Sequence, residues 1–257
     1  MTKLSALVCI SSLVAGIVGC MAENAKTESE QVAESESSII NGVETTGYPN
    51  IVALYGKKPG AEKGALCTAE VVSPTVLLTA AHCVAPAVVG EGLVYKALLG
   101  HNLVDAANPS PKVDVAEVHW DPEFDVQAIT NGHDIAVAIL AQPVNIKPLK
   151  INRASLPSLT KARLVGYGLN NGQEQTGAGI KRTAEVPVAS VDAKFVVTGE
   201  WFGTTMCSGD SGGPVLANIN GEDVIIGVNS FGFIQCLGTG SSTRVDSYLT
   251  FIDQYVH

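Results

Sequence analysis

Short apolar runs separated by turn residues occupy most of the chain after residue 50. Val, Ile and Leu dominate these runs, and Gly, Pro and Asn stand between them, which is the pattern of short β-strands. The predicted strands are residues 51–54, 69–72, 76–79, 93–99, 113–118, 135–140, 162–166, 181–188, 213–216, 224–229 and 241–245. Regular strands without intervening helices predict an all-β fold, built as closed barrels or a sandwich.

Only the tail departs from this rhythm. Residues 246–256 have helical spacing, with Tyr248, Leu249, Ile252 and Tyr255 or Val256 on one face. We therefore expect one C-terminal α-helix.

The first residues have the order of a secretory signal. Lys3 precedes an apolar run, residues 4–18, that is too short to span a membrane comfortably. The run ends in Ile-Val-Gly before Cys20, which resembles the lipobox of bacterial lipoproteins and predicts a lipid anchor on Cys20 after removal of residues 1–19. Ordinary cleavage after Ala22 is the alternative. The protein is expected in the cell envelope in the first case and as a secreted protein in the second.

The composition of residues 20–38 differs from that of the rest of the exported chain. Residues 20–38 are mostly Glu, Ser, Ala, Thr and Gln, and cannot bury enough surface to offset their ordering entropy, so they are predicted to be a disordered tether or propeptide. The folded part is predicted to span residues 39–257, with two lobes at about 39–150 and 151–245. A formal net charge of -9 argues against nucleic acid and anionic membranes as partners.

Three segments carry the chemistry. Residues 207–214 read Cys-Ser-Gly-Asp-Ser-Gly-Gly-Pro, in which glycines leave the Ser211 hydroxyl free to face a cleft. A hydroxyl is a weak nucleophile and needs a base that a third group orients. Thr-Ala-Ala-His-Cys supplies His82 after an apolar strand, and Asp134 heads the apolar run Ile-Ala-Val. Singly, each residue could be structural, but their order and flanks together favour a catalytic triad.

These motifs resemble the trypsin or chymotrypsin family of serine proteases. The resemblance covers residues 39–257, with supporting matches at 39–42, 99–102, 166–168 and 230–232. It implies two six-stranded antiparallel β-barrels with the active site between them, and an endopeptidase that acts on protein or peptide substrates without a cofactor. His82 would be the base, Asp134 its orienting group and Ser211 the nucleophile, and the amides of Gly209 and Ser211 would form the oxyanion hole.

The family resemblance also pairs the cysteines of the folded part. It implies a disulfide between Cys67 and Cys83, beside His82, and a second between Cys207 and Cys236, beside Ser211. Metal binding is the alternative use of a Cys/His cluster, but the spacings of zinc sites are absent.

Activation is the next implied property. In the family, a cut frees an amino group that enters the protein and pairs with the Asp before the nucleophile; the equivalents here are Ile39 and Asp210. The chain is therefore expected to be a zymogen. Ser38 precedes the cut where Arg or Lys is usual, so the activating protease is not identified by the sequence.

The family positions of the primary specificity pocket fall on five residues. Thr205 takes the base, where trypsin has Asp; Met206 adjoins it, and Ser230, Gly232 and Gly240 belong to the walls. Without a carboxylate the pocket cannot neutralise a substrate Arg or Lys, and burying that charge unpaired would cost several kcal/mol. We expect cleavage after a neutral, apolar residue.

The alternatives are a protease-like binding module and an α/β-hydrolase esterase. A protease-like binding module without turnover usually lacks a triad or oxyanion residue, and none is missing here. An α/β-hydrolase esterase needs a Gly-x-Ser-x-Gly elbow and the order Ser, acid, His, whereas this chain runs His, Asp, Ser.

Overall fold

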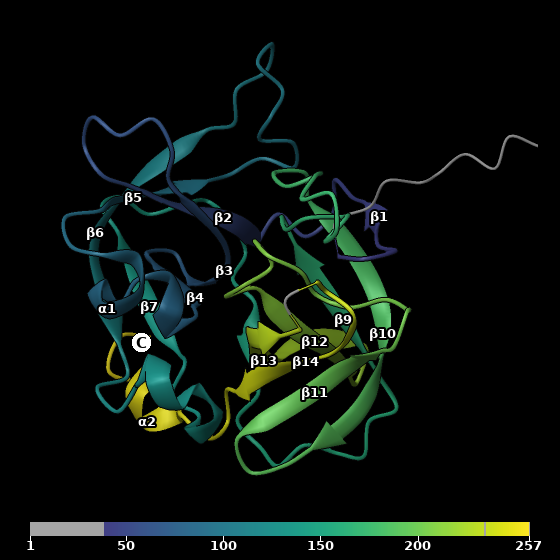
Figure 1. Ribbon diagram of the computed structural model, residues 1–257. Coiled ribbons are helices and arrows are strands. Elements are labelled where there is room, and N and C mark those ends of the chain that lie inside the picture. Colours follow the sequence, from purple (N-terminus) through teal and green to yellow (C-terminus); the bar gives the residue numbers. More distant parts are fainter. Residues whose placement is uncertain (1–38, 234, 257) are drawn as a thin grey trace, which may run out of the picture. The chain divides into compact units, whose positions relative to one another are not determined.

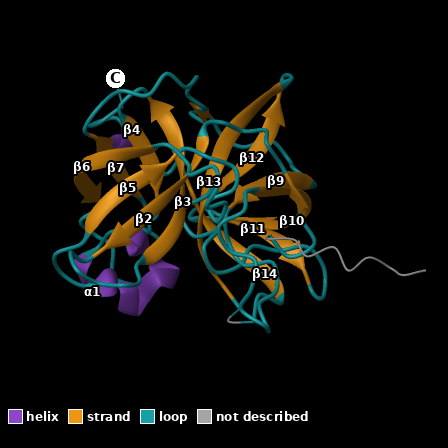
Figure 2. Cartoon of the chain, turned by 90° about the horizontal axis from the view of Figure 1, so that it is seen from above, coloured by secondary structure: helices purple, strands orange, loops and turns teal. Residues whose placement is uncertain are grey.

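The computed structural model describes residues 39–233 and 235–256. These residues form two β-barrels that lie side by side (Figure 1, Figure 2). The first barrel closes in the order β2-β3-β4-β7-β6-β5 with antiparallel neighbours throughout. Its strands are β2 (Ile51–Lys57), β3 (Ala65–Ser73), β4 (Val76–Thr79), β5 (Val94–Leu98), β6 (Lys112–Trp120) and β7 (Ala136–Leu140). Closure leaves this sheet without a free edge.

The second barrel follows along the chain. Its ring runs β9-β10-β11-β14-β13-β12 and closes where β12 pairs with β9. The strands are β9 (Lys161–Gly166), β10 (Arg182–Val191), β11 (Phe195–Glu200), β12 (Pro214–Ile219), β13 (Glu222–Gly232) and β14 (Gly238–Arg244). Two short strands are added outside the ring, β1 (Val43–Glu44) against β10 and β8 (Lys150–Ile151) parallel to β13. The two six-stranded antiparallel barrels confirm the predicted fold class.

Every apolar run predicted as a strand overlaps a strand of the structure. The prediction omitted β11, β1 and β8. In β11 the apolar run is only Phe-Val-Val, and Gly199 near its end has a φ of 93°, so neither length nor alternation marked it. β1 and β8 are two residues long and exist only through their partners.

The helices differ from the prediction. Short turns of helix stand at η1 (Ala81–Cys83), α1 (Pro86–Val89) and η2 (Val126–Asn131), and the tail forms only α2 (Leu249–Ile252) followed by turns. The predicted helix over residues 246–256 is thus too long. Tyr248, Phe251 and Ile252 belong to the same buried core cluster as the strands of the first barrel. Their packing holds this segment in place, so the segment does not depend on the stability of a long helix. In the described part of the chain, no helix has the length and apolarity to cross a membrane.

Glu70, in the middle of β3, is an exception in the core. It stands opposite Ile51 of β2 and Leu78 of β4 and is fully buried. Neither carboxyl oxygen has a hydrogen-bond partner among the described residues. Burial raises the pKa of Glu70 well above its ordinary value, so the folded protein holds this group as the neutral acid.

We expect Glu70→Gln to stabilise the protein at pH 8. Because the folded pKa is raised, the native state binds a proton that the unfolded state releases above about pH 4, so the free energy of unfolding falls as pH rises from there. The substitution keeps the shape and removes this pH-dependent loss, so the advantage of the variant should be largest at pH 8 and should shrink toward pH 4. Urea unfolding at both pH values, with exposed Glu174→Gln as control, measures it; equal pH slopes for parent and variant would contradict the assignment.

Candidate active site

His82 and Asp134 meet because β4 and β7 are paired. His82 follows β4 in η1, and Asp134 lies two residues before β7, whose Ala136 stands opposite Thr79. Asp134 is completely buried and accepts hydrogen bonds from the His82 backbone N–H at 2.8 Å and from Nδ1 at 2.7 Å. Since a carboxylate can only accept, Nδ1 carries the proton, and Nε2 is left as the acceptor.

A third donor reaches Asp134 from the second barrel. The hydroxyl of Ser230, on β13, donates to Oδ2 of Asp134. Ser230 also lines the cavity beside Ser211. The resemblance assigned Ser230 to a pocket wall, and its hydrogen bond to Asp134 is a feature that sequence reasoning missed.

Ser211 lies in the loop between β11 and β12. Gly209 in this loop has a φ of 97°, and a Cβ there would come within 2.8 Å of Gly168 Cα, so no other residue fits without a shift. Within the described chain, the backbone N–H groups of Gly209 and Ser211 donate to no acceptor. Two amide donors near the hydroxyl are therefore free for a bound oxygen.

Thr68 of β3 joins this loop to the first barrel. Its N–H donates to the Ser211 carbonyl at 2.8 Å, and its hydroxyl donates to the Gly209 carbonyl at 2.8 Å. The same hydroxyl oxygen accepts from the Tyr167 N–H at 3.2 Å. Sequence reasoning named the neighbouring Cys67 but not Thr68, because its partners are about 100 or more residues away along the chain.

Asp210 is the second buried carboxylate of the site. Its oxygens accept from the N–H groups of Gly168 at 2.8 Å and Cys207 at 2.9 Å, and from the N–H of Ile39. Burial raises the pKa of Asp210 to about 7, against the lowering effect of these donors. Ile39 is fully buried and has a φ of 51°, which is strained for a β-branched residue.

Two disulfides brace the loops on either side. Cys67–Cys83 ties β3 to the residue after His82, and Cys207–Cys236 ties the start of the Ser211 loop to the segment before β14. This is the pairing that the family resemblance implied. The sulfurs of Cys67 and Cys83 lie near the His82 ring, but their disulfide removes the thiolates that a metal would need.

A cavity of about 140 Å³ opens beside Ser211. It is lined by Met206, Cys207, Ser208, Ser211, Ser230, Phe231, Gly232, Phe233 and Cys236. Thr205 and Gly240 are not among these residues. Thr205 is buried and its carbonyl accepts from the Ile40 N–H, while a Cβ on Gly240 would lie 2.1 Å from Met206 Cε. The Met206 side chain thus lies against Gly240 and lines the cavity.

The other sites predicted from the sequence fall outside the described residues. These are Cys20, the signal over residues 1–19, the tether over residues 20–38 and the junction at Ser38. They stay predictions.

Comparison with known proteins gives a consistent result. A family model described as Trypsin matches residues 39–252. The chain is 24% identical to chymotrypsin-like elastase family member 1 of Canis lupus familiaris, over 88% of this chain and 95% of that protein. It is 29% identical to chymotrypsin of Phaedon cochleariae, over 84% of this chain and 82% of that protein. Because the family model spans most of the chain, including both barrels and the candidate site, the chain belongs to the trypsin family of serine proteases.

Proposed function

We propose that this protein is a serine endopeptidase in which Ser211, His82 and Asp134 act as a triad. The observation that carries the proposal is the buried Asp134 carboxylate on His82 Nδ1, which leaves Nε2 as a base. Ser211 Oγ attacks the scissile carbonyl while His82 takes its proton, and the C–N bond then breaks as His82 protonates the leaving amine. Water, deprotonated by His82, hydrolyses the acyl-enzyme by the reverse order of events.

The free backbone N–H groups of Gly209 and Ser211 stabilise the negative charge that develops on the carbonyl oxygen of the substrate. Donors fixed in the fold need no reorganisation during reaction, and losing one such donor typically costs about 10²–10³ in kcat. Asp134 stabilises the imidazolium form of His82, and Ser230 and the His82 N–H hold Asp134 in place.

Activation by a cut between Ser38 and Ile39 fits the surroundings of Asp210. In the intact chain the donor from Ile39 is a neutral peptide N–H, and the pKa of Asp210 stays raised. A cut would replace this donor with an ammonium group, whose charge a buried carboxylate needs. It would also remove the strained Ile39 φ, because that torsion exists only while residue 38 is attached. The activating enzyme is an unidentified protease or this protein itself.

Met206 supports a preference for a compact, neutral residue before the scissile bond. The cavity beside Ser211 is small, is lined in part by Met206 and has no acidic side chain among its described lining residues. An Arg or Lys would therefore be buried without a counter-ion. Alanine, valine and leucine suit the space better than a large aromatic ring.

Export follows from the leader and the disulfides together. Residues 1–19 act as the signal, Cys20 carries lipid or is released with the leader, residues 20–38 serve as tether and propeptide, and residues 39–257 form the peptidase. Two disulfides favour an oxidising compartment outside the cytosol.

Ser211→Ala should abolish peptide hydrolysis. We expect kcat to fall by about 10⁴–10⁶, with a similar loss for His82→Ala, because both groups take part in the same step. Processed protein should also be labelled on Ser211 by a serine-directed phosphonate, and Ser208→Ala, in the same loop, is the matched control. A folded, processed protein that is neither labelled nor active would instead be a protease-like binding module.

Met206→Gly should shift specificity toward large side chains. Removing the thioether deepens the cavity, so the ratio of kcat/KM for phenylalanine over valine before the scissile bond should rise by about tenfold. A fluorogenic peptide series that varies only this residue measures the ratio. An unchanged ratio, or parent enzyme that cleaves mainly after arginine, would refute the role of Met206.

Cutting before Ile39 should change the pH dependence of stability. In the intact chain the folded pKa of Asp210 is about 7. The free energy of unfolding should then fall as pH rises from about 4 to 7, since the unfolded state loses its proton first. After the cut, the ammonium keeps Asp210 charged and this fall disappears.

Intact and cut forms of the Ser211→Ala protein, unfolded in urea at pH 5 and 8, test this expectation. Glu70 is common to both forms and cancels in the comparison. Asp210→Asn should flatten the difference between them, and a cut form with the same pH slope as the intact form contradicts the pairing.

A further inference from the structure

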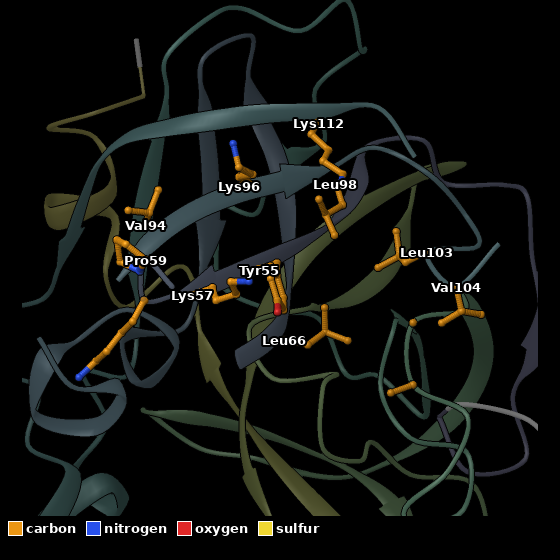
Figure 3. A pocket seen from close by; sticks show the side chains of 13 residues that line it. Tyr55, Lys57, Pro59, Leu66, Val94, Lys96, Leu98, Leu103, Val104 and Lys112 are labelled. Atoms are coloured by element: carbon orange, nitrogen blue, oxygen red, sulfur yellow. The ribbon is translucent and has the colours of Figure 1, made fainter. Parts of the chain in front are cut away.

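A large cavity lies on the outer face of the first barrel, and none of its lining residues belongs to the Ser211 loop. It has a volume of about 650 Å³, which is within the range of ligand pockets. Figure 3 shows the side chains that line it. They come from β2 and the two residues after it, from β3, β5, the loop after β5 and the start of β6, and from Ala178 and Gly179 in the segment before β10. We call it the lysine groove.

Strand register explains why these side chains share one face. Tyr55 of β2 stands opposite Leu66 of β3 on one side and Lys96 of β5 on the other. Lys57 stands opposite Val94, and Leu98 opposite Lys112. Because strand side chains alternate, the intervening Tyr95 and Ala97 point into the core and are buried, so this row faces outward.

The floor of the groove is apolar where the outside of a barrel is usually polar. Tyr55, Leu66, Leu98 and Leu103 are only partly buried, and Val94 and Val104 are 51% and 63% exposed. Apolar side chains gathered around one cavity at the surface favour an interaction site.

Lysines surround this floor in a chain of net charge -9. Lys57, Lys58, Lys96 and Lys112 line the groove. Lys96 pairs with Asp114, whereas no ion pair within the described chain involves Lys57, Lys58 or Lys112. The groove therefore has a local excess of positive charge, because three of its ammonium groups have no ion-pair partner in the described chain, and these groups lie beside apolar side chains.

The groove is also close to the active site along β3. Leu66 precedes Cys67, whose disulfide adjoins His82, and Thr68 donates to the Ser211 carbonyl. Two residues of strand span about 7 Å, so Leu66 lies one step from the residues that hold Ser211. The groove and the Ser211 loop are thus both attached to β3.

We propose that the lysine groove is an exosite for an acidic segment of the protein substrate that carries a bulky apolar side chain. Glutamates or aspartates would meet the lysines, and a leucine or phenylalanine between them would cover Tyr55 and Leu98. The apolar floor favours a peptide over a nucleic acid, whose backbone offers charge alone along its length. This proposal rests on the proposed protease function, which supplies the neighbouring site.

Direct binding tests the groove without catalysis. The probe is a short fluorescein-labelled peptide of glutamates interrupted by one leucine and one phenylalanine, added to the full-length Ser211→Ala protein. Fluorescence anisotropy should show saturable binding that weakens by at least about tenfold in the Lys57→Glu, Lys112→Glu double variant. The double variant Lys150→Glu, Lys161→Glu reverses the same charge outside the groove and should leave the binding unchanged.

Two control probes define the ligand. Peptides with glutamine for glutamate, or with alanine for leucine and phenylalanine, should each bind at least tenfold more weakly. Equal binding by the alanine peptide, tighter binding of a duplex oligonucleotide, or undiminished binding by the Lys57→Glu, Lys112→Glu protein would overturn the proposal.

Kinetics test whether the acidic segment improves cleavage when it is part of the substrate. Activated enzyme is compared on a short neutral peptide and on the same peptide extended at either end by the acidic segment. At least one extension should raise kcat/KM severalfold, and the ratio of extended to short should fall to about one in the Lys57→Glu, Lys112→Glu variant. If the short peptide is cleaved and neither extension raises kcat/KM, the exosite proposal is wrong. No cleavage of any peptide refutes the protease function, while the binding results still stand on their own.

Discussion

The hydrogen bonds of Thr68 set the position of the Ser211 loop on the first barrel. Its N–H and hydroxyl hold the carbonyls of Ser211 and Gly209, and its hydroxyl oxygen accepts from Tyr167 of the second barrel. His82 and Asp134 belong to the first barrel, so the distance between base and nucleophile depends on this contact. Thr79 donates its hydroxyl to the Thr68 carbonyl at 2.9 Å, which links the same residue to the strand before His82.

Three buried carboxyl groups show how the fold treats charge in different ways. Asp134 receives donors from His82 and Ser230. Asp210 receives only backbone donors in the intact chain, so burial still raises its pKa and its proton is held more tightly than that of an exposed Asp. The carboxyl oxygens of Glu70 have no hydrogen-bond partner among the described residues, and burial raises the pKa of this group. The number and charge of the donors decide whether a buried acid orients a base, changes state on activation or lowers stability.

The sequence predicted the fold class and most strands because apolar runs alternate with turn residues at regular intervals. It also identified His82, Asp134 and Ser211 as candidates, since each stands in a motif. Thr68 carries no such mark, because a threonine inside an apolar strand is ordinary until its distant partners are known. The same holds for the hydroxyl of Ser230 on Asp134 and for Met206 over Gly240, which both depend on side chains brought together only by the closed barrels.

Each of the two disulfides lies within one barrel, and among the described residues none joins the barrels. The boundary between them is held by packing and by hydrogen bonds such as those of Thr68 and Tyr167. Partial opening at this boundary would part the base from the nucleophile while both barrels kept their own cross-links. Turnover therefore reports opening at this boundary more sensitively than any signal from secondary structure does. On heating, activity can be lost before the barrels unfold.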